Sequence, residues 1–140
     1  MRLPIFPADD YPPIRVPEID REHLALANEL RNLLAAVKDD DRALAALLAE
    51  SLISGARDHF AHEERLMREI GFAGYQRHKH AHDEFLEEAR LHLDDLRAHG
   101  LTGCCLRWVA TTMSWFRSHV RTEDTALGRA INGASILIRP

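Results

Sequence analysis

The chain has 140 residues, 46% of them apolar, which is enough for one domain with a buried core and excludes a disordered chain. The net charge of −4, with histidines neutral, argues against nucleic acid or an anionic membrane as the main partner, because basic residues are too few to neutralise phosphates. Nine histidines stand out against this ordinary composition.

The two cysteines, Cys104 and Cys105, are adjacent and do not readily bridge each other, so we expect no disulfide framework. Such cysteine usage is typical of a reducing compartment. No stretch is long and apolar enough to cross a bilayer, and prolines interrupt the apolar residues near the N-terminus where a secretory signal would lie. We therefore expect a cytoplasmic protein without a membrane partner.

Residues 1–17 contain five of the six prolines. Because proline fixes φ and lacks a donor N–H, this segment is predicted to be an extended arm rather than a helix. Its apolar residues suggest that it lies along the surface of the domain, although a loose terminus is the alternative.

A first helix is predicted from Asp20, as its N-cap, to about Lys38. One face carries His23 and then apolar residues at three- and four-residue steps, a spacing typical of a helix buried on one side. These residues are Leu26, Ala27, Leu30, Leu33, Leu34 and Val37. His23 continues the apolar stripe and is therefore predicted to point inward. Three aspartates, Asp39 to Asp41, predict an exposed turn that caps the next helix.

A second helix is predicted from about Arg42 to Ile70 and a third from about Tyr75 to Ala98, separated by a glycine-bounded connection. Each carries a pair of metal-ligand residue types spaced four apart, which places the two side chains on one face, one turn apart. The inner face of the second helix is predicted to carry Leu48, Leu52, Gly55, His59, Glu63, Leu66 and Ile70. That of the third carries His78, His82, Phe85, Ala89, Leu93 and Leu96.

Gly100 is predicted to end the third helix and Thr102 to start the fourth, whose inner face steps through Cys105, Trp108, Thr112, Trp115 and His119. Asp124 follows five residues after His119, and five steps of a regular α-helix would turn its side chain off the His119 face. The helix must therefore end or widen there if both residues belong to one site.

Four amphipathic helices joined by short connections predict an all-α fold, an antiparallel up-down four-helix bundle. The bundle is expected to span residues 18–127, between the extended arm of residues 1–17 and a C-terminal tail of residues 128–140. The apolar run 136–138 in that tail either packs on the bundle or marks a contact surface.

Seven inward-facing residues are of metal-binding types: His23, His59, Glu63, His78, His82, His119 and Asp124. Seven ligands are too many for one ion and suit two, and ions held about 3.5–4 Å apart need bridging groups. A carboxylate has two oxygens, so Glu63 and Asp124 are predicted to bridge and the histidines to be terminal ligands. Nitrogen and carboxylate ligands suit iron, manganese or zinc.

These residues and their neighbours resemble the hemerythrin family, in its single-domain bacterial form. The resemblance covers about residues 14–127, fills all seven ligand positions, and rests on the stretches Pro17–His23, His59–Met67, Gly71–Phe72, His78–Phe85 and Trp115–Asp124. The chain departs from the usual family pattern in three places. Glu22 stands where glutamine is common, Phe72-Ala73 where tyrosine-proline is usual, and Ile14 near the place of a common tryptophan.

The resemblance implies a di-iron centre, with two iron ions bridged by both carboxylates and by an oxo or hydroxo group. His78, His82 and His119 would hold one iron, and His23 and His59 the other. The second iron would keep an open position, where dioxygen binds reversibly and takes up two electrons. The resemblance therefore implies a non-enzymatic protein of oxygen transport, storage, delivery or sensing.

A histidine-rich ligand set supplies little negative charge, which favours reversible binding over the highly oxidised states of carboxylate-rich di-iron enzymes. Three apolar side chains near the ligands are predicted to wall an oxygen pocket, with plain core packing as the alternative for each: Leu26, Phe85 and Trp115. The other four histidines lie off the inner stripes and are predicted to be surface residues: His62, His80, His92 and His99.

Two alternative functions stay open. A di-iron enzyme acting on peroxide or nitric oxide would need a polar or acidic group that reaches the open iron, and Glu22 is the nearby candidate. A signalling module would pass its metal state to a protein partner through the arm or the tail. The sequence does not indicate an oligomeric state.

Overall fold

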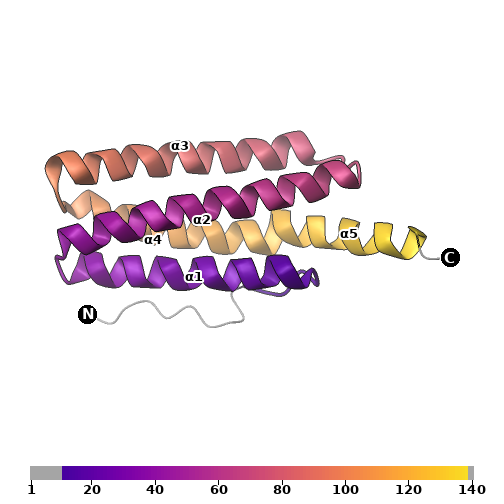
Figure 1. The fold of residues 1–140 in the computed structure, drawn as a ribbon, viewed down its shortest axis with the longest axis horizontal. Helices are drawn as coiled ribbons and strands as arrows, with labels where there is room; N and C mark the ends of the chain where they lie inside the picture. Colours follow the sequence, from indigo (N-terminus) through magenta and orange to yellow (C-terminus); the bar gives the residue numbers. More distant parts are fainter. Residues whose placement is uncertain (1–10, 139–140) are drawn as a thin grey trace.

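The computed structural model describes residues 11–138, with side chains as far as Ala134. Four helices lie side by side (Figure 1): α1 (Pro17–Lys38), α2 (Arg42–Glu69), α3 (Tyr75–His99) and α4 (Gly103–His119). A short π-helix, η2 (Val120–Asp124), and a further helix, α5 (Thr125–Ile138), prolong α4, and α5 projects beyond the end of the bundle. The predicted all-α four-helix bundle is confirmed, and the described chain contains no strand.

The start of α1 differs from the prediction. The helix begins at Pro17, after Val16 as N-cap, so Asp20 lies inside the first turn and is not the cap. Proline suits the first helical position because its fixed φ matches the helix and its missing N–H would have had no partner there. Asp20 instead accepts a hydrogen bond from the backbone N–H of Ile14 at 2.8 Å, which fastens the arm to the helix.

The connections between helices follow the predicted turn residues. Asp41 caps α2 by accepting a hydrogen bond from the N–H of Leu44 at 3.1 Å, as expected. At the other end of α2, Gly71 has a φ of +62°, and the N–H of Phe72 bonds the carbonyl of Met67 at 2.9 Å. This is the usual glycine-dependent C-terminal cap. Gly100, with a φ of +80°, ends α3 in the same left-handed region.

The core runs along the inside of the bundle and contains most of the predicted inner faces. On α2 the buried stripe is shifted by one residue in places: Ala45, Ala49, Phe60 and Met67 are buried, whereas the predicted Leu48 and Leu66 are only partly covered. The described part of the arm is not helical, and its residues Tyr11, Ile14 and Val16 are buried. Among the described helices, none combines the length and apolar character needed to span a bilayer.

Candidate metal centre

The fold brings all seven predicted ligand residues together inside the bundle. They come from α1, α2, α3, α4 and η2, and each has at most 5% of its surface exposed. Their donor atoms fall into two groups that share Glu63 and Asp124, and within each group the atoms lie within 4.8 Å of one another. One group adds His78, His82 and His119, and the other adds His23 and His59.

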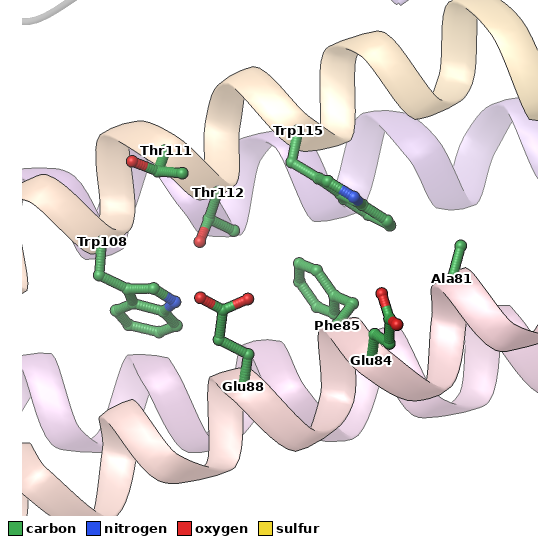
Figure 2. Close-up of a pocket in the computed structure, with 8 residues that line it drawn as sticks. All are labelled: Ala81, Glu84, Phe85, Glu88, Trp108, Thr111, Thr112 and Trp115. Carbon is green, nitrogen blue, oxygen red and sulfur yellow. The ribbon is translucent and has the colours of Figure 1, made fainter.

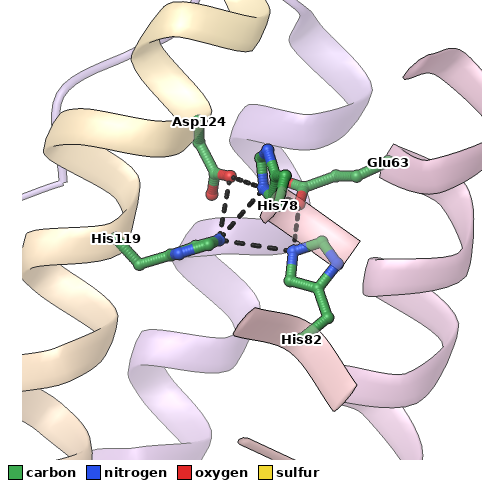
Figure 3. A group of neighbouring side chains, drawn as sticks. All are labelled: Glu63, His78, His82, His119 and Asp124. Carbon is green, nitrogen blue, oxygen red and sulfur yellow. Dashed lines mark hydrogen bonds and ion pairs between the residues drawn. The ribbon is translucent and has the colours of Figure 1, made fainter. Parts of the chain in front are cut away.

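In the three-histidine group, the Nε2 atoms of the rings converge (Figure 3). Nε2 of His119 lies 3.1 Å from Nε2 of His78 and 3.3 Å from Nε2 of His82. Nitrogens about 2.1 Å from one ion and at right angles to each other would be separated by about 3 Å. The three rings are therefore arranged so that their Nε2 atoms could bind one shared metal ion.

The two carboxylates each direct one oxygen to each group. Asp124 Oδ1 lies 2.9 Å from Nε2 of His78 and Oδ2 lies 2.9 Å from Nε2 of His23. Glu63 Oε1 lies 3.1 Å from Nε2 of His82, and Oε2 lies 3.1 Å from Nε2 of His59. Oxygens of one carboxylate that face two different donor groups are what a bridging ligand needs.

The π-helix places Asp124 on the same side as His119. Over Val120–Asp124 the helix is wider than an α-helix, so the five-residue separation no longer turns the carboxylate away. Asp124 Oδ1 lies 3.2 Å from Nε2 of His119 as a result. The expectation that the helix must end or widen here is confirmed.

Attraction between the histidines and the carboxylates shifts the pKa values of these groups. Burial disfavours the charged form of His59, but the charge of Glu63 and contacts with Glu22 and Glu63 outweigh it and raise the pKa to about 10. Burial likewise opposes the charge on His78, yet its contacts with Asp124 and Glu63 raise its pKa to about 9. The pKa values of both carboxyl groups are lowered, against burial, by the surrounding histidines.

Hydrogen bonds between the residues do not account for all of the polar atoms in the site. Within the described part of the chain, four buried atoms have no hydrogen bond of acceptable geometry: Nε2 of His59, Oε1 of Glu63 and both carboxylate oxygens of Asp124. Buried polar atoms are normally paired, so such a concentration is typical of a site that can bind an ion. Imidazole nitrogen with carboxylate oxygen is a donor set that iron accepts.

Aromatic rings pack around the histidines. Phe60 stacks on His82 with ring centroids 3.9 Å apart and planes 6° apart, and Trp115 stacks on His119 at 4.6 Å. Phe116 meets His23 edge-on at 5.8 Å. The sequence prediction did not include Phe60 and Phe116 among the residues around the site. Both lie close to ligands in the sequence, because Phe60 follows His59 directly and Phe116 lies three residues before His119.

The three predicted pocket walls occupy two different places. Phe85 and Trp115 stack at 4.8 Å and line a groove of about 220 Å³ between α3 and α4 (Figure 2). Leu26 lines a separate pocket of about 200 Å³ between α1 and α2, together with Glu22, Gly55 and His59. The three side chains therefore do not enclose one common cavity.

The remaining histidines differ in exposure. The side chains of His80 and His99 are 73% and 71% exposed, as predicted. His92 is partly covered because it stacks on Trp108 at 5.0 Å. His62 departs furthest from the surface prediction: its side chain is 17% exposed, and its Nδ1 lies 2.8 Å from a carboxylate oxygen of Glu22.

Known proteins similar to this chain share both the sequence pattern and the fold. Residues 15–131 match the hemerythrin HHE cation binding domain. Myohemerythrin of Riftia pachyptila is 30% identical over 83% of this chain and 85% of its own, and bacteriohemerythrin of Pseudomonas aeruginosa strain LESB58 is 26% identical over 81% and 72%. A crystal structure of wild-type hemerythrin superposes with a TM-score of 0.82 at 19% identity, covering 93% of this chain and 98% of that one. The chain therefore belongs to the hemerythrin HHE cation-binding family.

Proposed function

We propose that this protein binds two iron ions through the seven clustered residues and binds dioxygen reversibly at them. The observation that carries the proposal is the division of the carboxylate oxygens. One oxygen of Glu63 and one of Asp124 lie beside each histidine group, so the groups offer five and four donor residues. The ion beside His23 and His59 would have one protein ligand fewer, and we assign the external ligand to that position.

The surrounding residues support reversible binding by keeping the centre dry and its ligands fixed. Iron, when bound, supplies the electrons that dioxygen takes up. His23, His59 and the shared carboxylates are at least 97% buried, and Phe116 covers His23 from the side. Exclusion of water would slow side reactions at the site, because fewer protons and water molecules could reach a bound ligand.

An enzymatic role would need an acidic group that can reach the external ligand. Glu22 was the nearby candidate, but its Oε1 lies 2.7 Å from Nδ1 of His59, on the outer edge of that ring. Its Oε2 lies 2.8 Å from Nδ1 of His62, so both oxygens are engaged. This arrangement favours a binding protein over an enzyme acting on peroxide or nitric oxide.

The test is the visible absorption spectrum of iron-loaded, anaerobically reduced protein before and after oxygen is added. We expect a new band that disappears when oxygen is removed, and that returns on a second exposure. Immediate and permanent oxidation without such a band would contradict reversible binding. Catalytic consumption of peroxide or nitric oxide by the same sample would favour the enzymatic alternative.

A further inference from the structure

Two of the candidate ligands have a carboxylate on the ring edge that faces away from the centre. Nδ1 of His59 lies 2.7 Å from Oε1 of Glu22, and Nδ1 of His82 lies 2.9 Å from Oε2 of Glu64. The Nε2 atoms of both rings face Glu63 at 3.1 Å. Each ring therefore has a donor N–H directed outward when its Nε2 lone pair is directed inward.

The two outer carboxylates, Glu22 and Glu64, contact histidines in different halves of the site. Glu22 contacts a histidine of the two-histidine group, and Glu64 contacts one of the three-histidine group. By contrast, the buried Nδ1 atoms of His23 and His78 have no hydrogen-bond partner among the residues that the structure describes. One histidine in each half is thus held by a charged acceptor.

Glu22 is itself held in place by a second histidine. Its other oxygen, Oε2, lies 2.8 Å from Nδ1 of His62, and Nε2 of His62 lies 3.9 Å from a carboxylate oxygen of Glu18. The chain of contacts from His59 through Glu22 to His62 therefore reaches from the buried centre to the surface. The spacing of α1 and α2 residues makes this possible, since His59 and His62 lie three apart on one helix and Glu22 faces them from the other.

We propose that Glu22 and Glu64 are positioning residues, one for each metal position, and that His62 fixes Glu22. The inference rests on the proposed function, because it assumes that His59 and His82 bind metal. A carboxylate that accepts the outer N–H fixes the tautomer and rotation of the ring and makes its inner nitrogen a stronger donor. Loss of such a partner typically weakens metal binding by about 10- to 100-fold.

Glu22 and Glu64 should differ in how strongly the metal positions that they support bind metal. Glu22 serves one of two histidines, and its side chain is 34% exposed beside the pocket that also contains Leu26 and His59. Glu64 serves one of three histidines, and its side chain is only 13% exposed. We therefore expect the Glu22-supported position to bind metal more weakly and to lose it first.

The test is anaerobic titration of the metal-free protein with Fe²⁺ against a competing chelator. The two binding steps are assigned beforehand with His59→Ala and His119→Ala, which each remove a ligand of one group. Glu22→Ala removes the acceptor and is expected to weaken the step lost in His59→Ala by about 10- to 100-fold, and Glu64→Ala the step lost in His119→Ala. His62→Ala should weaken the same step as Glu22→Ala, by a smaller factor.

Asp95→Ala is the matched control, because Asp95 forms a similar contact of 3.0 Å with the exposed His99, away from the centre. Thermal melting of each metal-free variant shows whether the fold is intact. Equal weakening of both steps in each variant, or affinities that match Asp95→Ala, would overturn the inference. If the wild-type protein binds fewer than two ions, the proposed function fails as well, whereas two tight wild-type steps with unaffected variants refute only the positioning roles.

Discussion

At the scale of single residues, the burial of two carboxylates within a helical core is the most unusual feature. Glu63 and Asp124 are both 0% exposed. An unpaired buried carboxylate costs several kcal/mol of stability, so charged histidines around it, or metal ions bound between them, are needed to compensate. The same residues therefore link folding, protonation and metal binding.

Protons and metal ions should compete for the histidines. Because the pKa values of His59 and His78 are raised to about 10 and about 9, both rings are charged at neutral pH in the metal-free protein and must lose protons when metal binds. We predict that apparent metal affinity rises steadily from pH 6 to pH 9, with proton release seen by calorimetry in buffers of different ionisation enthalpy. Affinity that does not change over this range would contradict the assignment of these two ligands.

The metal-free protein should show the opposite trend in stability. Raised histidine pKa values stabilise the fold fully below the ordinary value of 6.5, and this stabilisation is lost as pH rises through about 9 to 10. We predict that the free energy of unfolding of metal-free protein, measured in urea, falls as the pH rises from 6.5 to about 10. Metal-loaded protein should lack that fall, and identical pH profiles for the two forms would refute the prediction.

At the scale of helices, the sequence indicated the lengths and most of the buried faces, but less of the detail at their ends. The first helix was placed too late because Asp20 is a good N-cap residue by type, whereas here its side chain holds Ile14. The widened turn before Asp124 could be anticipated, because only a change in helix geometry lets residues five apart share a face. The shift on α2 was not visible, because small residues such as Ala45 and Ala49 can be buried or exposed.

Two helical glycines should respond oppositely to replacement by alanine. At Gly55 an added Cβ would lie 3.4 Å from Oε2 of Glu29 and 3.6 Å from Leu26, which are ordinary contacts. At Gly128 it would lie 2.4 Å from the backbone oxygen of Ile14. We predict that Gly55→Ala raises the free energy of unfolding by about 0.5–1 kcal/mol through helix propensity.

Gly128→Ala should lower the free energy of unfolding by about 1–3 kcal/mol, because α5 and the arm must move apart to make room for the added Cβ. Urea unfolding of the two metal-free variants beside wild type measures both changes. A stabilised Gly128→Ala variant would show that the arm and α5 do not pack as closely as described.

At the scale of the whole molecule, the described part of the arm connects α5 to the candidate metal centre. Ile14, Val16 and Ile19 form a small apolar cluster with Ile131 of α5, and the side-chain amide of Asn132 lies 3.4 Å from the carbonyl of Ile14. Tyr11 packs on Phe116 at 5.3 Å, and Phe116 in turn contacts His23. The prediction that the arm lies along the bundle therefore holds for its described residues, while prolines such as Pro4 and Pro7 lie outside them.

Removing an arm anchor should destabilise the whole domain. We predict that Ile14→Ala lowers the free energy of unfolding by about 2–5 kcal/mol, since this side chain is 4% exposed. Leu24→Ala, at a position 54% exposed, is the control and should change it by less than about 0.5 kcal/mol. Equal effects of the two substitutions in urea unfolding would show that the arm adds little to the stability of the bundle.

The candidate centre was more predictable than its surroundings. The spacing of four along two helices and the unusual number of inward histidines predict the seven residues from the sequence alone. The outer contacts of Glu22, Glu64 and His62 could not be foreseen in the same way, because each depends on how two helices are rotated against each other. The groove in Figure 2 likewise depends on the spacing of α3 and α4, which a periodic pattern does not specify.

The most direct test of the account is anomalous diffraction at the iron edge from crystals of the iron-loaded protein. We predict two peaks per chain, both between Glu63 and Asp124. One should lie within bonding distance of Nε2 of His78, His82 and His119, and the other within bonding distance of Nε2 of His23 and His59. A single peak, or two peaks away from the shared carboxylates, would contradict the assignment of these seven residues to one two-metal centre.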